Sequence, residues 1–122
     1  LDFGCAKLVG AERLTSVGIT IGTLAYQPPE AFDTQREVDP TADVWMLAVT
    51  AYELLQSRHP FLDEDYPRTL ARISKGQYDK LDGARFPILA PIVEQCLDVD
   101  PARRPQNAEE LAARIQASLG ES

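Results

Sequence analysis

The sequence feature that most constrains the fold is an apolar run at residues 42–55, ADVWMLAVTAYELL. An aspartate–proline pair at 39–40 precedes it, and such a pair suits the N-cap and the first turn of a helix. Apolar side chains cover every face of this helix, which predicts a central helix buried on all sides. Its polar residues Asp43, Thr50 and Glu53 must then have partners, because an unpaired buried carboxylate is strongly unfavourable.

Three shorter helices are expected after the central one. Residues 67–75 end at Gly76, a favourable C-terminal cap, and residues 91–97 place apolar side chains on one stripe. The last helix starts from Asn107, which resembles the first residue of a capping box, and runs to Gly120. No segment alternates apolar and polar residues as a half-buried strand does, so the chain is predicted to be mainly helical.

Composition and charge exclude several classes of function. The chain is 44% apolar and 25% charged, as in ordinary globular domains, and its net charge of −7 leaves no basic surplus for nucleic acid or anionic lipid. No apolar run approaches the roughly 20 residues of a membrane span. Cys5, Cys96 and the single His59 lack the spacing of a zinc site. A reducing, cytoplasmic setting is expected, and a membrane anchor elsewhere in a longer protein stays open.

Residues 5–25 are expected to form a long surface loop, with glycines and hydroxyl side chains scattered along it. Loops of this length without regular structure are uncommon in compact domains and are usually functional. The hydroxyls of Thr15, Ser16 and Thr20 could accept a phosphate, which would add about −1.5 to −2 charges and order the loop against an arginine. Unmodified surface hydroxyls remain the alternative.

Short motifs follow one another along the chain. In order they are LDFG at 1–4, GTLAYQPPE at 22–30, DVWMLA at 43–48, HPF at 59–61, and CL at 96–97 with DPARRP at 100–105. Their order and spacing resemble the C-terminal lobe of a eukaryotic-type serine/threonine protein kinase over essentially all 122 residues. An unrelated helical interaction domain would require all of these motifs to coincide by accident.

The resemblance implies a mainly α fold, the C-terminal lobe of the bilobal kinase domain. Residues 1–30 would be the activation segment and residues 31–122 the helical body of this lobe. The N-terminal lobe and the catalytic loop, which precede the LDFG motif in the family, are absent from the sequence. Because the only methionine is Met46, Leu1 is not an initiator, and we expect the chain to be the back half of a larger catalytic domain, inactive on its own.

Asp2, Phe3 and Gly4 match the turn that holds magnesium in this family. By resemblance, Asp2 would bind Mg²⁺ across the phosphates of ATP, since this hard cation prefers one or two carboxylate oxygens beside phosphate and water. Phe3 would pack beneath a helix of the N-terminal lobe, and Gly4 would allow the backbone to turn. The alternative for Asp2 is an aspartate that caps a turn before glycine.

Gly22, Thr23 and Tyr26 resemble the substrate platform, which receives the residue after the phosphorylated one. Threonine at this position is typical of serine/threonine kinases, whereas tyrosine kinases usually have proline. Thr23 therefore favours a serine or threonine acceptor in the protein substrate. The alternative is an ordinary turn hydroxyl. Ile19 stands where many relatives carry a phosphorylated residue, so regulation would use the other hydroxyls or none.

Further residues match structural positions of the family. Glu30 and Arg104 resemble an ion pair that anchors the end of the activation segment, since a planar guanidinium matches a carboxylate with two hydrogen bonds. Asp43 resembles the aspartate that accepts backbone hydrogen bonds from the catalytic loop. Glu53 matches a position that contacts basic substrate residues in some relatives, and a structural partner for a nearby arginine is the alternative. Ala48 replaces a glycine that is usual in the family.

The function implied by the resemblance is that of an ATP- and Mg²⁺-dependent serine/threonine protein kinase acting on a protein substrate, and the alanine-rich last helices favour a bacterial source. The rival hypothesis is a pseudokinase, a scaffold or allosteric regulator with the same fold and a defective catalytic loop. A His-Arg-Asp motif with the following lysine and asparagine, about 25 residues before Leu1, would support the enzyme.

Overall fold

The computed structural model describes residues 24–33 and 39–120, and within these ranges the chain is helical. The elements are η1 (Pro29–Phe32), α3 (Pro40–Gln56), α4 (Tyr66–Lys75), α5 (Leu89–Cys96), η2 (Pro101–Arg103) and α6 (Ala108–Gly120). The described residues contain no β-strand, which confirms the prediction of a mainly α fold. None of the described helices is long and apolar enough to cross a membrane.

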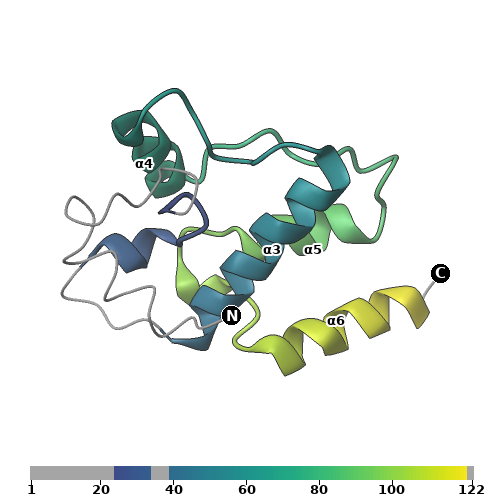
Figure 1. Ribbon diagram of the computed structural model, residues 1–122. Coiled ribbons are helices and arrows are strands. Elements are labelled where there is room, and N and C mark those ends of the chain that lie inside the picture. The colour runs from purple at the N-terminus through teal and green to yellow at the C-terminus, as the bar shows by residue number, and fades with distance from the viewer. Residues whose placement is uncertain (1–23, 34–38, 121–122) are drawn as a thin grey trace.

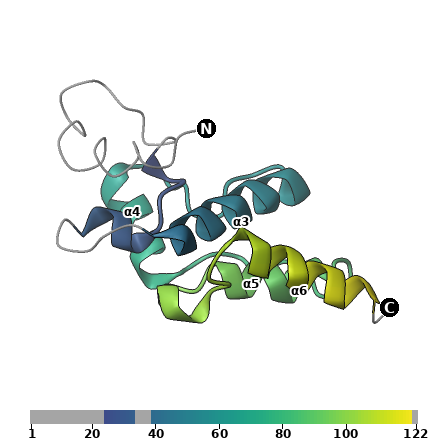
Figure 2. The ribbon, with the colours of Figure 1, turned by 90° about the horizontal axis from the view of Figure 1, so that it is seen from below.

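Helix α3 lies at the centre of the described residues, and the other elements are arranged around it (Figures 1 and 2). Helices α5 and α6 lie alongside α3 and contact each other, and η2 contacts α3 as well. Helix α4 contacts η1 at the end of the molecule away from the C-terminus. This arrangement brings the segment before α3 and the segment after α5 to the same central helix.

Local interactions determine both boundaries of α3, and the sequence indicated those at its start. The side chain of Asp39 accepts hydrogen bonds from the Thr41 backbone N–H, at 2.9 Å, and from the Thr41 hydroxyl. Pro40 occupies the first turn, where its missing N–H would have no helical partner. The helix ends at Ser57, whose left-handed backbone (φ 58°) lets its N–H donate to the carbonyl of Glu53.

The hydrophobic core forms on one side of α3 and includes side chains from α4, α5 and the connecting loops. Trp45 stacks on Phe61, with ring centroids 5.2 Å apart and planes 12° apart. Tyr52 is buried, and its hydroxyl donates to the backbone carbonyl of Asp79 at 2.6 Å. Ile73 from α4 and Val93 from α5 complete the same cluster. The core therefore holds the loop after α3 against the central helix.

The prediction that α3 is buried on all sides is wrong for this structure. Leu47 is 44% exposed, Leu54 is 80% exposed, and Thr50 is also exposed. Together with the partly buried Asp43, these residues recur at the spacing of one helical face. An apolar pattern reports the preference of a side chain for burial but does not identify the segment that covers it. No element of residues 24–33 or 39–120 covers this face, which we call the open face of α3.

The three shorter helices begin and end close to the predicted positions. Helix α4 ends at Gly76, which adopts a left-handed backbone with φ 62°. Helix α5 begins two residues before the expected start because Pro91 is tolerated within the first turn, where its N–H is not needed. At the start of α6, the side chain of Asn107 accepts a hydrogen bond from the Glu110 N–H at 2.8 Å, as expected for a cap.

Candidate functional site

Glu30, in η1, and Arg104, which follows η2, form a buried ion pair across 74 positions of sequence. Arg104 Nη1 donates to one Glu30 carboxylate oxygen at 2.7 Å and Nη2 donates to the other at 2.9 Å. The Arg104 side chain is 0% exposed and the Glu30 side chain 4% exposed. This two-bond geometry requires a planar guanidinium and could not be formed by lysine.

The remaining contacts of Arg104 join two more parts of the chain. Its Nη1 also donates to the backbone carbonyl of Thr41 at 3.1 Å, and its Nε donates to the carbonyl of Asp98 at 2.7 Å. Its guanidinium lies over the ring of Trp45, 4.9 Å from the centroid, a cation–π contact. The arginine thus fastens η1, the start of α3 and the loop after α5 at one buried point.

Tyr26, which lies before η1, is held by side chains from α3 and from the loop after it. The Tyr26 hydroxyl donates a hydrogen bond to Glu53 in α3, and the Tyr26 ring meets the ring of His59 edge-on with centroids 4.9 Å apart. The hydrogen bond to Glu53, burial and the negative charge of Glu53 raise the pKa of Tyr26 to about 12. Tyr26 is therefore a neutral phenol near pH 7, and its hydroxyl can donate the hydrogen bond to Glu53.

Asp43 lies on the open face of α3 near the start of the helix. Burial, and secondarily the charge of Asp39, raise the pKa of the Asp43 carboxyl above its ordinary value. Among the described residues, no side chain or backbone N–H donates a hydrogen bond to this carboxylate. Of the three polar residues of α3 that were predicted to have partners, Thr50 pairs with the Met46 carbonyl at 3.0 Å and Glu53 pairs with Tyr26. The prediction is wrong for Asp43 within the described residues.

His59 is a part of this region to which the sequence assigned no role, beyond its place in the HPF motif and its lack of zinc-site spacing. Its Nδ1 accepts hydrogen bonds from the backbone N–H groups of Phe61, at 3.0 Å, and Leu62, at 3.2 Å. A signal for this turn is present in the sequence, because Pro60 has a fixed φ suited to the first position of a turn, in which a preceding side chain can accept from the N–H groups two and three residues further on. Burial lowers the pKa of His59.

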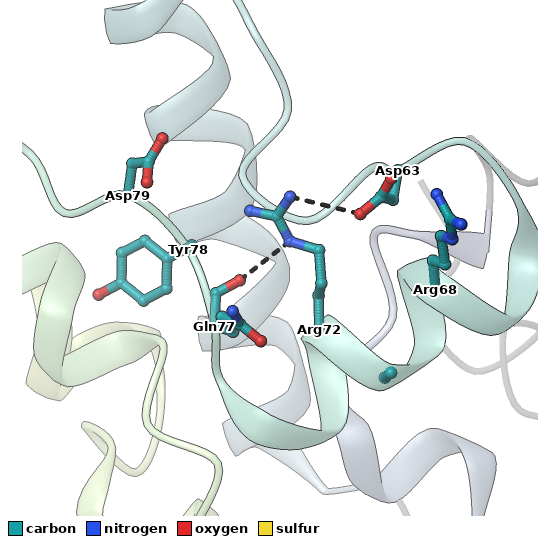
Figure 3. A pocket seen from close by; sticks show the side chains of 7 residues that line it. Asp63, Arg68, Arg72, Gln77, Tyr78 and Asp79 are labelled. Atoms are coloured by element: carbon teal, nitrogen blue, oxygen red, sulfur yellow. Dashed lines mark hydrogen bonds and ion pairs between the residues drawn. The ribbon is translucent and has the colours of Figure 1, made fainter.

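A separate pocket of about 450 Å³ lies between α4 and the segment after it (Figure 3). Arg72 lies among its lining residues and donates from Nε to the carbonyl of Gln77 and from Nη2 to the carbonyl of Pro60, each at 3.2 Å. It also pairs with Asp63 at 3.7 Å. The charge of Arg72 is thereby used to join α4 to the neighbouring loops, which indicates a structural role for the residue.

Eight predicted site residues lie outside the described residues: Asp2, Phe3, Gly4, Thr15, Ser16, Thr20, Gly22 and Thr23. The described residues include no group of three or more histidine, cysteine, aspartate or glutamate side chains that could hold a metal ion. Of the predicted residues within the described ranges, the structure brings Glu30 to Arg104 and Tyr26 to Glu53, and it leaves Asp43 apart from both pairs.

Comparison with known proteins identifies relatives whose sequences match most of this chain. The chain is 32% identical to serine/threonine-protein kinase drp72 of Corynebacterium efficiens over 95% of its length, and 34% identical to serine/threonine-protein kinase pkn2 of Myxococcus xanthus over 97%. It is also 32% identical to the probable serine/threonine-protein kinase nek3 of Dictyostelium discoideum over 85%. It spans 22%, 15% and 9% of the length of these three relatives, respectively.

A family-level match covers nearly all of the chain. The sequence profile of the protein kinase domain matches residues 1–114, from the LDFG motif to α6. The matched region includes both pairs described above, Glu30 with Arg104 and Tyr26 with Glu53. The chain belongs to the protein kinase domain family.

Proposed function

We propose that this chain is the substrate-binding part of an ATP-dependent serine/threonine protein kinase. The observation that carries the proposal is the double attachment of residues 26–30, through Tyr26 to Glu53 and through Glu30 to Arg104. Such an attachment fixes the end of the activation segment on a rigid helical body, where a peptide could be held for phosphate transfer. The names of the three relatives, each a serine/threonine-protein kinase, support the serine/threonine class.

The protein substrate would meet the platform formed by Gly22, Thr23 and Tyr26. The threonine at position 23, which is typical of serine/threonine kinases, supports a serine or threonine as the phosphate acceptor in the substrate. Glu53 is partly exposed, and its contact with Tyr26 uses one carboxylate oxygen, Oε1. We assign the free side of this carboxylate to a basic residue of the substrate, and the net charge of −7 supports a protein substrate over nucleic acid.

Asp2 would hold Mg²⁺ on the phosphates of ATP, because a carboxylate supplies the oxygen ligand that this cation prefers. The phosphate-transfer machinery of protein kinases also needs a glycine-rich loop, a strand lysine and a catalytic loop with its base. None of these motifs occurs in the 122 residues, so we infer that the chain alone does not transfer phosphate. Thr15, Ser16 and Thr20 are the candidate sites for activating phosphorylation, which phosphopeptide mass spectrometry would locate.

The open face of α3 supports a further part of the proposal. A carboxylate without a described donor, Asp43, shares this face with the exposed Leu47 and Leu54. In the whole kinase domain, backbone N–H groups of the catalytic loop would bind Asp43, and the helix before that loop would cover the leucines. A covered face would remove their apolar surface from water, which is worth about 25 cal/mol per Å².

The test is phosphate transfer by the full-length protein to serine- and threonine-containing peptides. We expect transfer that requires ATP and Mg²⁺ and that falls by orders of magnitude in Asp2→Asn. Glu109→Gln, an exposed change in α6, is the matched control and should retain full activity. Undiminished transfer by Asp2→Asn would reject the magnesium role. Absence of transfer by the wild-type protein under all conditions would favour the pseudokinase.

A second measurement tests the chain by itself. Adding ATP and Mg²⁺ to the 122 residues should leave their melting temperature unchanged, because the principal nucleotide-binding groups of the family are not in the sequence. A saturable rise of several degrees would contradict this inference. The cytoplasmic setting was expected because the two cysteines lie far apart in the sequence and lack the spacing of a zinc site. Fractionation of cells that produce the full-length protein tests it.

A further inference from the structure

His59 lies where three separate segments meet. Its Nδ1 accepts from the backbone N–H groups of Phe61 and Leu62, which folds the loop after α3 back on itself. Its ring meets the ring of Tyr26 edge-on at an interplanar angle of 82°. Tyr26 in turn donates to Glu53 of α3. One imidazole therefore connects the loop after α3 with the segment that carries the substrate platform.

The hydrogen bonds determine which form of the imidazole is present. An Nδ1 atom that accepts two N–H groups cannot itself carry a proton, so the ring is neutral and its proton is on Nε2. Protonation of Nδ1 would direct a third N–H at the two backbone donors and leave both without an acceptor. Burial lowers the pKa of His59, the charge of Glu53 opposes this, and the charge of Arg72 reinforces it.

Through its contact with Tyr26, the neutral His59 ring also affects the predicted substrate platform. The Tyr26 side chain is held by a hydrogen bond at its hydroxyl and by the edge-on contact of its ring with the imidazole. Ring pairs with this edge-on geometry are favourable beyond the area that they bury. If the loop after α3 loses its turn, the imidazole moves and Tyr26 keeps only the attachment to Glu53.

We propose that His59 is a positioning residue for the protein substrate, which in its neutral Nε2–H form holds the loop after α3 and thereby supports Tyr26 on α3. The inference rests on the proposed function, because it concerns how that same site receives a peptide. Nε2 is buried without a partner among the described residues, so the role is carried by Nδ1 and by the ring contact with Tyr26. His59 touches neither ATP nor the transferred phosphate in this role.

Two substitutions separate the two contacts. His59→Asn keeps an oxygen acceptor close to the position of Nδ1 and removes the ring, whereas His59→Phe keeps a ring and removes the acceptor. In the full-length protein, we expect both variants to raise the KM for a peptide substrate by roughly threefold to tenfold, the range of a lost ring pair, with the KM for ATP unchanged. Glu109→Gln remains the control.

The expected split between the two Michaelis constants distinguishes positioning from a general loss of structure. A merely structural role would lower the active fraction and reduce kcat with both KM values unchanged. An unchanged peptide KM in both variants, or an equal rise in the KM for ATP, would overturn the inference. A peptide KM that rises only in His59→Phe would limit the role to the turn and would refute the contribution of the Tyr26 contact.

The tautomer is measured without any activity. Nitrogen-15 NMR of labelled histidine, with His59→Asn as the subtraction control, should show an unprotonated Nδ1 and a protonated Nε2 for His59. This pattern should persist at a pH below 6.5, where an exposed histidine becomes charged. A protonated Nδ1 at neutral pH would overturn the inference. If the pattern is found but no peptide is phosphorylated, the proposed function fails while the contacts of His59 stand.

Discussion

The buried pair of Glu30 and Arg104 allows a quantitative prediction for the variant Arg104→Lys. Four hydrogen bonds leave the guanidinium, two to the Glu30 carboxylate and one each to the carbonyls of Thr41 and Asp98. Lysine keeps the charge but has one nitrogen, which cannot reach all of these acceptors. At least two buried acceptors lose their donor, and at roughly 1–3 kcal/mol each we expect a loss of about 3 kcal/mol in the free energy of unfolding.

Urea unfolding, followed by circular dichroism and by the fluorescence of Trp45, measures this loss. Trp45 is the only tryptophan of the chain and lies under Arg104, so its emission reports the region directly. The control is Glu94→Gln, which breaks the pair of Lys80 and Glu94, whose side chains are 65% and 51% exposed. Exposed pairs contribute less than about 1 kcal/mol, so this variant should unfold almost as the wild type does.

A double-mutant cycle tests whether the two side chains act as a pair. Glu30→Gln alone should cost about 3–5 kcal/mol, since it leaves a buried guanidinium without its counter-charge. The double variant Glu30→Gln/Arg104→Lys should then cost less than the sum of the two single changes, by more than about 0.5 kcal/mol. Additive losses, or an Arg104→Lys variant as stable as Glu94→Gln, would refute the reasoning.

Three further predictions concern single positions. Gly76→Ala should cost about 1–2 kcal/mol in urea unfolding, because φ is 62° and a Cβ would lie 2.9 Å from Val99 Cγ1; Gly83→Ala, with nothing within 4 Å, is the control, and equal effects of the two changes would contradict the prediction. Asp43→Asn should raise the free energy of unfolding at pH 7, because the raised pKa of Asp43 means that the folded state disfavours its charge. This increase in stability should disappear below pH 3.8, where the carboxyl is protonated in both the folded and the unfolded state. An increase that is the same at every pH would argue against this cause. The lowered pKa of His59 means that, as pH falls, this imidazole binds a proton in the unfolded chain before it does so in the folded one. The contribution of His59 to stability should therefore be constant above about pH 6.5 and decline below it. His59→Asn should remove that decline, and an unaltered dependence of stability on pH would assign the decline to other groups.

The sequence predicted well those features that depend on neighbouring residues. The aspartate–proline start of α3, the Gly76 end of α4 and the Asn107 cap of α6 each need only a few adjacent positions, and all three occur in the structure. Side-chain hydrogen bonds over two or three residues are local chemistry, so a single sequence contains the information.

Features that depend on contacts between distant segments could not be predicted from the pattern of residues in the sequence. The open face of α3 carries leucines that look the same in sequence as those of the core, because hydrophobicity does not identify the covering segment. The pairing of Glu30 with Arg104 was expected only from family resemblance. The position of His59 between Tyr26 and its own loop depends on how two segments meet, and neither segment has a periodic signal for that contact.

The long separation between Glu30 and Arg104 also has a kinetic consequence. Their contact closes a loop of 74 residues, and the entropy lost on closing a long loop is paid before such a contact can stabilise the chain. The helices and their caps involve near neighbours and can form earlier. Contacts that form after the folding transition state change the rate of unfolding and leave the rate of folding almost unaltered. The pair therefore governs how long η1 remains attached to the helical body in each folded molecule, and contributes little to how quickly that molecule folds.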